Sequence, residues 1–236
     1  MQTVFKNRRQ AGILLSKKID SASMDPTRTI LLGLPRGGVE LAYEMSKFLK
    51  IPMDVLIVRK VGHPMYSEYG IGAVGEGGFS WLDPDALGIH DIMPEKIYSL
   101  FEAERKEVAR RKVIYRSEGE LPSLEGKTVI IVDDGLATGV TARLAARLVK
   151  MKKAKKVVLA VPVCLGKTEF LKKEFDEVVC LLESKNGTSV GSFFRHFDQV
   201  SDDEVIALLS EAKNNYPENL IPDSNIDIYS KDRMHA

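Results

Sequence analysis

Two adjacent carboxylates follow a run of apolar residues near the middle of the chain. The stretch VIIVDDGLATGVTA, residues 129–142, places Asp133 and Asp134 at the end of a predicted buried strand. Two acids at such a point are costly to bury unless they interact with a partner. A loop of small residues and threonines comes next, and a helical pattern begins near Val140. The chemistry expected here is the binding of a ligand that carries both hydroxyl groups and an anion.

The loop has the composition of a phosphate site. Gly135, Gly139 and the small Ala137 permit a tight turn that directs backbone N–H groups inward at the helix start. Free N–H groups and the helix dipole favour an anion at that position. Thr138 and Thr141 add hydroxyl donors. A ribose 5-phosphate satisfies the acids and the loop together, whereas an ordinary capped strand–helix turn explains only one of the two aspartates.

The acids need a scaffold that holds strand ends along one edge. Short apolar runs rich in β-branched residues predict strands at 29–34, 53–59, 128–134, 156–163 and 177–182. Helical patterns occupy 38–50, with Phe48 on its apolar face, 94–116, with Pro94 near its first turn, and 140–153, with Met151 on its apolar face. This alternation predicts an α/β fold with a mostly parallel five-stranded sheet and helices on both faces. Ligands of such sheets bind at the carboxyl ends of strands.

Two regions interrupt the alternation of strands and helices. Residues 61–93 are rich in glycine, with alternating apolar positions around Gly77-Gly78, which predicts a hairpin insertion and a flexible cover. Short terminal helices are expected at 5–20 and at 201–213, the second with Ser201 as its N-cap. The predicted organisation is one domain over 1–216, with a core of about 26–182, a small hood from 1–25 and 183–216, and a C-terminal tail over 217–236.

Composition narrows the classes of partner. The chain has 34 lysines and arginines against 33 aspartates and glutamates, so its net charge of +1 gives no reason to expect nucleic acid or a membrane surface. No apolar run is long enough to cross a bilayer, and the polar start does not resemble a signal peptide. Cys164 and Cys180 form no metal-binding motif. A reducing cytoplasmic location is therefore expected.

The stretch 129–142 resembles the phosphoribosyl diphosphate (PRPP) motif of the type I phosphoribosyltransferases, in which four apolar residues and two acids precede a Thr-Gly-x-Thr loop. The resemblance implies that Asp133 and Asp134 hold the ribose 2- and 3-hydroxyls. It also implies that the 5-phosphate is held by Gly135, Leu136, Ala137, Thr138, Gly139, Val140 and Thr141. The family's cofactor is Mg²⁺, held mainly through PRPP itself and on the protein side by Asp133 or Asp134.

Two further segments match the family in order. GLPRGGV, residues 33–39, resembles the pyrophosphate loop, which implies that Arg36 and Gly37 contact the diphosphate. Arg59 and Lys60 end the second predicted strand, where the family often carries a basic residue that reaches the same diphosphate. A solvated strand end is the alternative for whichever of the two points away. Arg36 and Lys60 are accordingly expected to be catalytic residues.

The acceptor is less closely indicated. The 6-oxopurine branch of the family carries an aspartate at the position of Ala137, so hypoxanthine and guanine are disfavoured. RKVGHPMYSEYG, residues 59–70, is similar to a segment of the adenine branch, which implies that Glu68 assists proton transfer at the base. A solvated loop acid is the alternative for Glu68, and Glu76 is a weaker rival for the role. His63 is interpreted as a loop residue.

Other side chains are assigned mainly to structure. Arg110-Arg111 is interpreted as a helix face paired with Glu104 and Glu107, and Trp81 as a packing residue. In the late segment 189–200, two of three phenylalanines are expected in the core and the third beside a flat ring. Those three are Phe193, Phe194 and Phe197.

The termini extend the resemblance to a bacterial group of phosphoribosyltransferases whose acceptor is unnamed. The first helix matches that group at Phe5, Arg8, Ala11 and Gly12. For Arg8 a surface role is favoured over one at the site.

The function implied by the resemblance is transfer of ribose 5-phosphate from PRPP to a nitrogenous base or related acceptor, with release of pyrophosphate, as in nucleotide salvage. The anomeric carbon passes through an oxocarbenium-like state, so the protein mainly positions the reactants, screens the diphosphate and excludes water. A homodimer is expected from the family. The alternative is a domain that senses PRPP without turnover, which is weakened because neither terminus carries a predicted nucleic-acid-binding segment.

Overall fold

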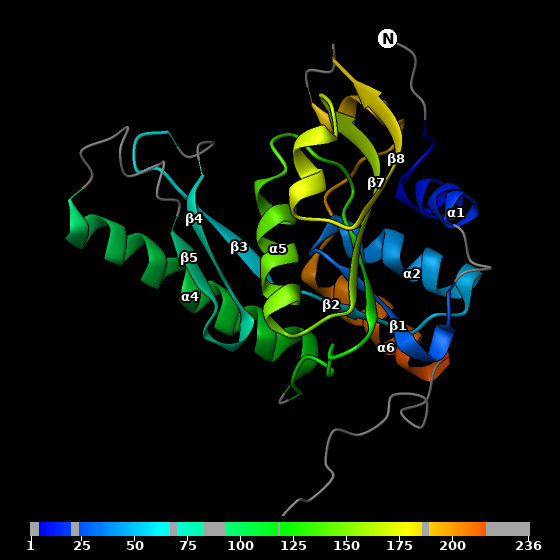
Figure 1. The fold of residues 1–236 in the computed structure, drawn as a ribbon, viewed down its shortest axis with the longest axis horizontal. Helices are drawn as coiled ribbons and strands as arrows, with labels where there is room; N and C mark the ends of the chain where they lie inside the picture. Colours follow the sequence, from blue (N-terminus) through cyan, green and yellow to red (C-terminus); the bar gives the residue numbers. More distant parts are fainter. Residues whose placement is uncertain are drawn as a thin grey trace, which may run out of the picture.

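A five-stranded sheet in the order β2-β1-β6-β7-β8 forms the centre of the computed structural model, which describes residues 5–19, 24–66, 70–82, 93–117, 119–185 and 189–215 (Figure 1). Its strands are β1 (Thr29–Gly33), β2 (Met53–Val55), β6 (Thr128–Val132), β7 (Lys156–Leu165) and β8 (Glu177–Ser184). Every neighbouring pair in this sheet is parallel. The prediction of an α/β fold with a parallel five-stranded sheet is therefore confirmed.

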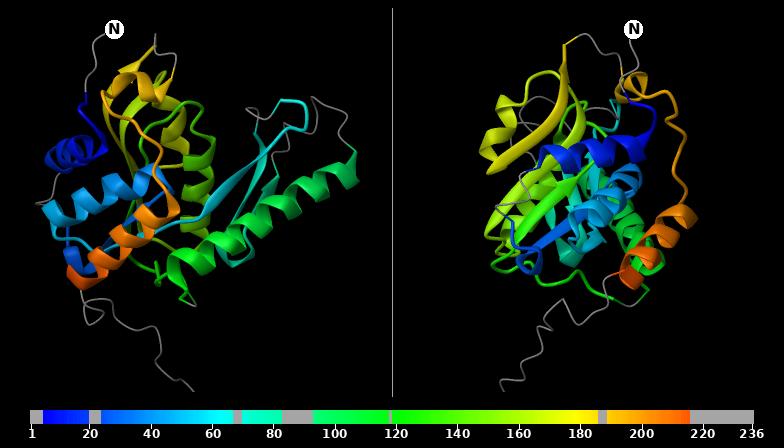
Figure 2. Two further views of the ribbon diagram at one scale, coloured as in Figure 1. Left: turned by 180° about the vertical axis from the view of Figure 1, so that it is seen from behind. Right: turned by 90° about the vertical axis from the view of Figure 1, so that its right-hand side faces the viewer.

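Successive strand residues enter two different hydrophobic cores. Leu31 and Ile130 pack on one side of the sheet, whereas Ile30 and Ile131 pack on the other, because side chains alternate along a strand. The first side is covered by α2 (Gly37–Leu49), with α1 (Arg8–Lys18) and α6 (Asp202–Asn215) packed on α2. The second side is covered by α5 (Val140–Met151). Figures 1 and 2 show these layers.

The boundaries of α2 and α5 agree with the helical patterns, but two side chains do not face the core. Phe48 is 50% exposed and Met151 is 70% exposed, so the prediction that they lie on buried faces is wrong. Each residue lies in the last turn of its helix, where only one side of the helix still meets the packed layers.

The predicted strand 53–59 divides into two. The chain leaves the parallel sheet after Val55, and β3 (Val58–Gly62) belongs to a separate antiparallel sheet with β4 (Gly70–Gly75) and β5 (Ser80–Leu82). A short 3-10 turn, Glu76–Gly78, joins β4 to β5, so the hairpin expected at Gly77-Gly78 is confirmed.

The helix α4 (Pro94–Arg116) runs along the antiparallel sheet and has Pro94 at its start, as expected. We call β3, β4, β5 and α4 together the arm, because they stand out from the body of the molecule (Figure 2). The expected cover, 61–93, overlaps this arm, but 67–69 and 83–92 lie outside the described residues.

A buried ion triad anchors the arm to the parallel sheet. The Arg116 guanidinium donates to both Asp54 carboxylate oxygens at 3.0 Å and also contacts the Glu76 carboxylate. The three residues are almost completely buried. The second Glu76 oxygen accepts the backbone N–H of Ile57 at 2.8 Å. Glu76 is therefore a structural residue, and the suggestion that it rivals Glu68 in proton transfer is wrong.

The two terminal segments of the predicted hood meet each other. The N–H of Phe5 donates to the carbonyl of Phe193 at 3.0 Å, and the N–H of Arg195 donates to the carbonyl of Phe5 at 2.9 Å. Ser201 caps α6 through a capping box, because its hydroxyl accepts from the Glu204 N–H and its own N–H donates to the Glu204 carboxylate. The predicted tail, 217–236, lies outside the described residues. No helix in the described part of the chain combines the length and apolar character of a membrane span.

Candidate functional site

The two predicted ligand loops lie side by side at the carboxyl edge of the parallel sheet. β1 and β6 are neighbours with Gly33 opposite Val132, so the segments that follow them leave the sheet together. A Cβ added to Gly37 would lie 1.9 Å from Oδ2 of Asp134, and one added to Gly38 would lie 2.3 Å from the Val132 carbonyl oxygen. The absence of side chains at these two glycines is what permits this contact. The structure thus brings the start of the Gly37-Gly38 segment against the acid pair.

The two aspartates differ in their partners. Oδ2 of Asp134 accepts a hydrogen bond from Nε of Arg8 at 2.8 Å, whereas a carboxylate oxygen of Asp133 accepts the backbone N–H of Asp134 at 2.9 Å. Burial, together with the neighbouring Asp134 carboxylate, raises the pKa of Asp133 well above its usual value. Burial also raises the pKa of Asp134, and Arg8 opposes that rise. The pair therefore carries electrostatic strain in the free protein.

The loop after the acids ends in an open helix N-terminus. Gly139 adopts a left-handed conformation with φ of 70°, which favours glycine, and it is the N-cap of α5. The N–H of Arg143 makes the first bond of the helix, to the Gly139 carbonyl at 3.0 Å. Within the described residues, nothing accepts from the N–H groups of Thr138 and Thr141. Since the first turn of α5 contains no acid, its dipole favours an anion there.

The start of the loop is fixed to the sheet. Leu136 forms an isolated parallel bridge with Cys164 on β7. Its N–H donates to the Val163 carbonyl, and its carbonyl accepts from the Leu165 N–H, both at 2.8 Å. Ala137 and Thr138 are exposed beyond this anchor. The loop therefore presents a rigid base and an accessible tip.

The basic residues predicted for the diphosphate separate into two groups. Arg36 caps α2 at the loop, and its side chain makes no ion pair with any described residue. The stem of Lys60 lies beside Gly70, which in turn lies against Val140 at the start of α5. Lys60 therefore faces the phosphate loop.

Arg59, by contrast, points to the opposite face of β3. Its guanidinium donates to Glu104 on α4 at 2.7 Å. The structure does not bring Arg59 to the two ligand loops, because adjacent residues of a strand point to opposite faces and Lys60 occupies the face toward α5. Arg59 is the residue of the pair that points away.

Arg8 is the residue that the sequence interpretation placed wrongly. The sequence favours a surface role, yet Arg8 is 7% exposed and bonded to Asp134. Its guanidinium lies 3.8 Å from the ring centroid of Phe197 and donates to the Asp198 carbonyl at 2.7 Å. Its position in the Phe5-x-x-Arg8 match to the bacterial group is the signal that points to a site role.

The three phenylalanines behave as expected. Phe193 and Phe194 are buried, and the Phe194 ring packs against Phe5 with centroids 5.3 Å apart. Phe197 is the half-buried member, and the Arg8 guanidinium covers its ring. Two phenylalanines are thus core residues, as expected, and the third lies against Arg8.

Several other predictions concern the arm. Arg110 and Arg111 both pair with Glu107, which confirms a salt-bridged helix face, although Glu104 pairs with Arg59 instead. Trp81 packs under the Arg147 guanidinium, 4.3 Å from its ring centroid. His63 is buried after β3, and its Nδ1 accepts from the Met65 N–H. Glu68, the predicted proton-transfer residue, lies outside the described residues.

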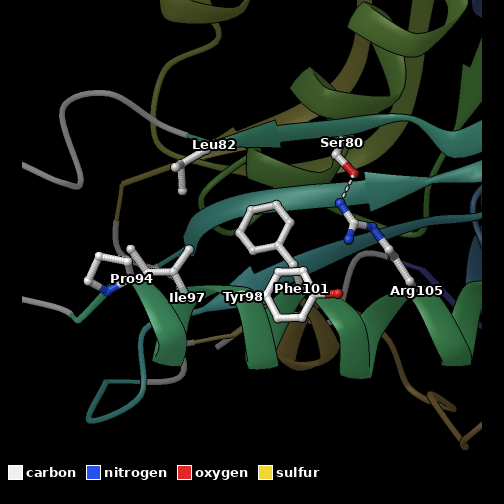
Figure 3. A pocket seen from close by; sticks show the side chains of 7 residues that line it. All are labelled: Ser80, Leu82, Pro94, Ile97, Tyr98, Phe101 and Arg105. Carbon is white, nitrogen blue, oxygen red and sulfur yellow. Dashed lines mark hydrogen bonds between the residues drawn. The ribbon is translucent and has the colours of Figure 1, made fainter.

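A groove of about 550 Å³ lies on the arm between β5 and α4 (Figure 3). Its lining residues are Ser80, Leu82, Pro94, Ile97, Tyr98, Phe101 and Arg105. The lining is mainly apolar, and its charged group, Arg105, donates to the Ser80 hydroxyl at 3.0 Å. No residue of the two ligand loops lines it, so this groove is distinct from the candidate PRPP site.

The donors available to a metal are carboxylate oxygens. Among the described residues, no group of three acids, histidines or cysteines could hold a metal by itself. The Asp133 and Asp134 oxygens suit Mg²⁺, which commonly combines one or two carboxylates with phosphate oxygens of a substrate. The donor chemistry of the acid pair therefore fits a magnesium ion that also binds substrate phosphate oxygens.

Comparison with known proteins agrees with this geometry. The phosphoribosyl transferase domain family matches residues 5–193. Two Mycobacterium tuberculosis proteins, "Putative phosphoribosyl transferase Rv0571c" of strain H37Rv and its counterpart MT0597 of strain CDC 1551, are each 37% identical over 218 residues. The alignments cover 91% of this chain but 48% of those proteins, so the chain spans about half the length of these relatives.

A solved structure resembles the whole fold. The crystal structure of TT1426 from Thermus thermophilus is 36% identical, with a TM-score of 0.76. The match covers 88% of this chain and 98% of TT1426. On the extent of the domain match and the similarity in fold, the chain belongs to the phosphoribosyl transferase domain family.

Proposed function

We propose that this protein transfers ribose 5-phosphate from PRPP to a nitrogenous acceptor and releases pyrophosphate. The observation that supports the proposal is the contact between the two loops at Gly37 and Asp134. A ligand bound there would meet an acid pair and two helix N-termini at once, those of α2 and α5. PRPP has the matching groups: ribose hydroxyls, a 5-phosphate and a diphosphate.

Each part of the site has a role in this proposal. Asp133 and Asp134 accept hydrogen bonds from the ribose hydroxyls, and the N–H groups and hydroxyls of Thr138 and Thr141 hold the 5-phosphate. Arg36, the Gly37 backbone and Lys60 screen the diphosphate as its bond to the anomeric carbon breaks. A bound Mg²⁺ would neutralise part of the diphosphate charge, with Asp133 or Asp134 on its protein side.

The acceptor is proposed from the resemblance to the adenine branch. Ala137 offers no carboxylate to a 6-oxopurine, and Glu68 is the candidate for proton transfer at the acceptor nitrogen. The half-buried Phe197 contacts Arg8, which bonds Asp134, so Phe197 is the candidate to flank a flat ring. A homodimer and a role in nucleotide salvage complete the proposal.

Calorimetric titration with PRPP and magnesium is the direct test, followed by a pyrophosphate-release assay against adenine, uracil, orotate and other bases. Binding with release for one base supports the proposal and names the acceptor. The double variant Asp133→Asn, Asp134→Asn should fold normally and lose PRPP binding, because amides cannot replace two hydrogen-bond-accepting carboxylates. Unchanged PRPP affinity in that variant would show that the acids do not form the site, and binding without release for any base would indicate a PRPP sensor.

A further inference from the structure

We propose that Arg8 is a positioning residue for the ribose acids and links the hood to the PRPP site. The inference rests on the proposed function, since it assigns Arg8 a task at that site. The Arg8 guanidinium, which belongs to the N-terminal helix, lies where three other segments meet. These are the loop at Gly37, the acid pair and the late segment around Phe197.

Arg8 fixes one oxygen of one acid. Its Nε lies 2.8 Å from Oδ2 of Asp134, and the same nitrogen would lie 2.8 Å from a Cβ at Gly37. No described side chain bonds the other oxygen of Asp134, Oδ1. Arg8 therefore holds the Asp134 carboxylate in one orientation and leaves Oδ1 to accept from a ligand hydroxyl.

Arg8 is itself held from the opposite side. Its guanidinium lies on the Phe197 ring at 3.8 Å and donates to the Asp198 carbonyl at 2.7 Å. A planar guanidinium can combine a stacking contact with directed hydrogen bonds, which a lysine ammonium cannot. Arg8 thus connects the hood segment at Phe197 and Asp198 to the Asp134 carboxylate, so the position of one depends on the position of the other.

The neighbouring arginine provides the contrast. Arg9 has the same charge, but 62% of its side chain is exposed and its pair with Glu40 is at 3.4 Å. Only 8% of the Arg8 side chain is exposed. Burying an arginine beside a carboxylate removes both charges from water, so the contact needs good geometry to be retained. A surface role does not account for such a contact at the ligand edge of the sheet.

The test compares PRPP, which contains a ribose, with inorganic pyrophosphate, which does not. Arg8→Met, Arg8→Lys and the control Arg9→Met would each be titrated with PRPP and, separately, with inorganic pyrophosphate, both with magnesium. For Arg8→Met we expect PRPP affinity to fall by about 10- to 100-fold, because the loss of a hydrogen bond that involves a charged group weakens binding by about that factor. Pyrophosphate affinity should change by less than about twofold, because pyrophosphate has no ribose hydroxyls for Asp134 to bind and Asp133 remains available to its magnesium. Arg9→Met should leave both affinities unchanged.

Arg8→Lys retains the charge next to Asp134 but loses the stacked fork, so we expect it to recover part of the lost PRPP affinity. It carries the test if Arg8→Met does not fold, in which case PRPP affinity should fall severalfold while pyrophosphate affinity holds. An equal loss of affinity for both ligands, or an unchanged affinity for PRPP in an Arg8 variant, would overturn the positioning role. If the wild-type protein binds pyrophosphate but not PRPP, the proposed function itself fails, and the role of Arg8 fails with it.

Discussion

Replacing Gly37 with alanine is the sharpest single test of the contact between the two loops. The new Cβ would lie 1.9 Å from Oδ2 and 2.6 Å from Cγ of Asp134, and 2.8 Å from Nε of Arg8. The first of these distances is about 1.5 Å short of the 3.4 Å at which contacts become ordinary. The carboxylate of Asp134 must therefore move, and Arg8 must move with it.

The size of the effect follows from that displacement. A displaced Asp134 carboxylate would lose its hydrogen bonds to the ribose, and because a hydrogen bond to a charged group is worth about 1.5–3 kcal/mol, we expect PRPP affinity to fall by about 10- to 100-fold. Helix propensity acts in the other direction, since alanine is favoured over glycine inside a helix by about 1 kcal/mol and Gly37 is the first residue of α2. A loss of affinity would therefore come from the clash and not from a weakened helix.

The assay is titration with PRPP and magnesium, with thermal unfolding measured in parallel. Gly78→Ala is the matched control, because Gly78 lies in the hairpin turn of the arm with nothing within 4 Å of an added Cβ. Its positive φ of 76° makes alanine cost about 1–2 kcal/mol locally, so it tests whether lost stability alone weakens binding. If folded Gly37→Ala binds PRPP within twofold of wild type, the proposed contact between the loops in the ligand site is wrong.

Two further predictions concern the arm. Arg116→Met would leave the buried Asp54 and Glu76 carboxylates without their cation, so we expect urea denaturation to show a loss of about 3–5 kcal/mol in the free energy of unfolding. Arg110→Met, on the exposed face of the same helix, should show a much smaller loss. Similar losses in both variants would contradict the anchoring role of the triad. The hydrogen bond from Arg110 lowers the pKa of Glu107 to about 2 from the usual 4.5, so the stability from Glu107 is present above about pH 4.5 and is lost as the pH falls toward 2. The stability difference between wild type and Glu107→Gln, below about 1 kcal/mol at neutral pH, should therefore shrink on acidification, and a constant or growing difference would refute this account.

Local patterns in the sequence account for most of the fold. The strands of the parallel sheet are apolar runs buried on both faces, and such runs are recognisable without tertiary information. The division of 53–59 into β2 and β3 is not recognisable in this way. It depends on Glu76, far along the chain, whose carboxylate accepts the Ile57 N–H where the strand turns away.

In the candidate site, too, some features follow from local sequence and others depend on contacts between distant residues. The acid pair and the two loops are contiguous motifs, so their residues could be named from the sequence. The orientations of Arg59 and Lys60 could not, because they depend on which face of β3 meets α5 and which meets α4. Arg8 was misplaced for a related reason: its partners, Asp134 and Phe197, lie more than a hundred residues away and are brought together by folding.

The two acids have different hydrogen-bond partners in the free protein, and this difference bears on how a ligand could bind. Burial disfavours the charge of both carboxylates, and Arg8 opposes this for Asp133 only through its charge, whereas it also hydrogen-bonds Asp134. A second arginine beside Asp133 would stabilise the free protein, but it would occupy the oxygens that the proposed ligand needs. The fold therefore tolerates one poorly compensated carboxylate at the end of β6, and the hydroxyls and magnesium of bound PRPP would provide the missing partners. In this interpretation the electrostatic strain at Asp133 is relieved on binding, so it contributes to the affinity for a ligand that brings both donors and a cation.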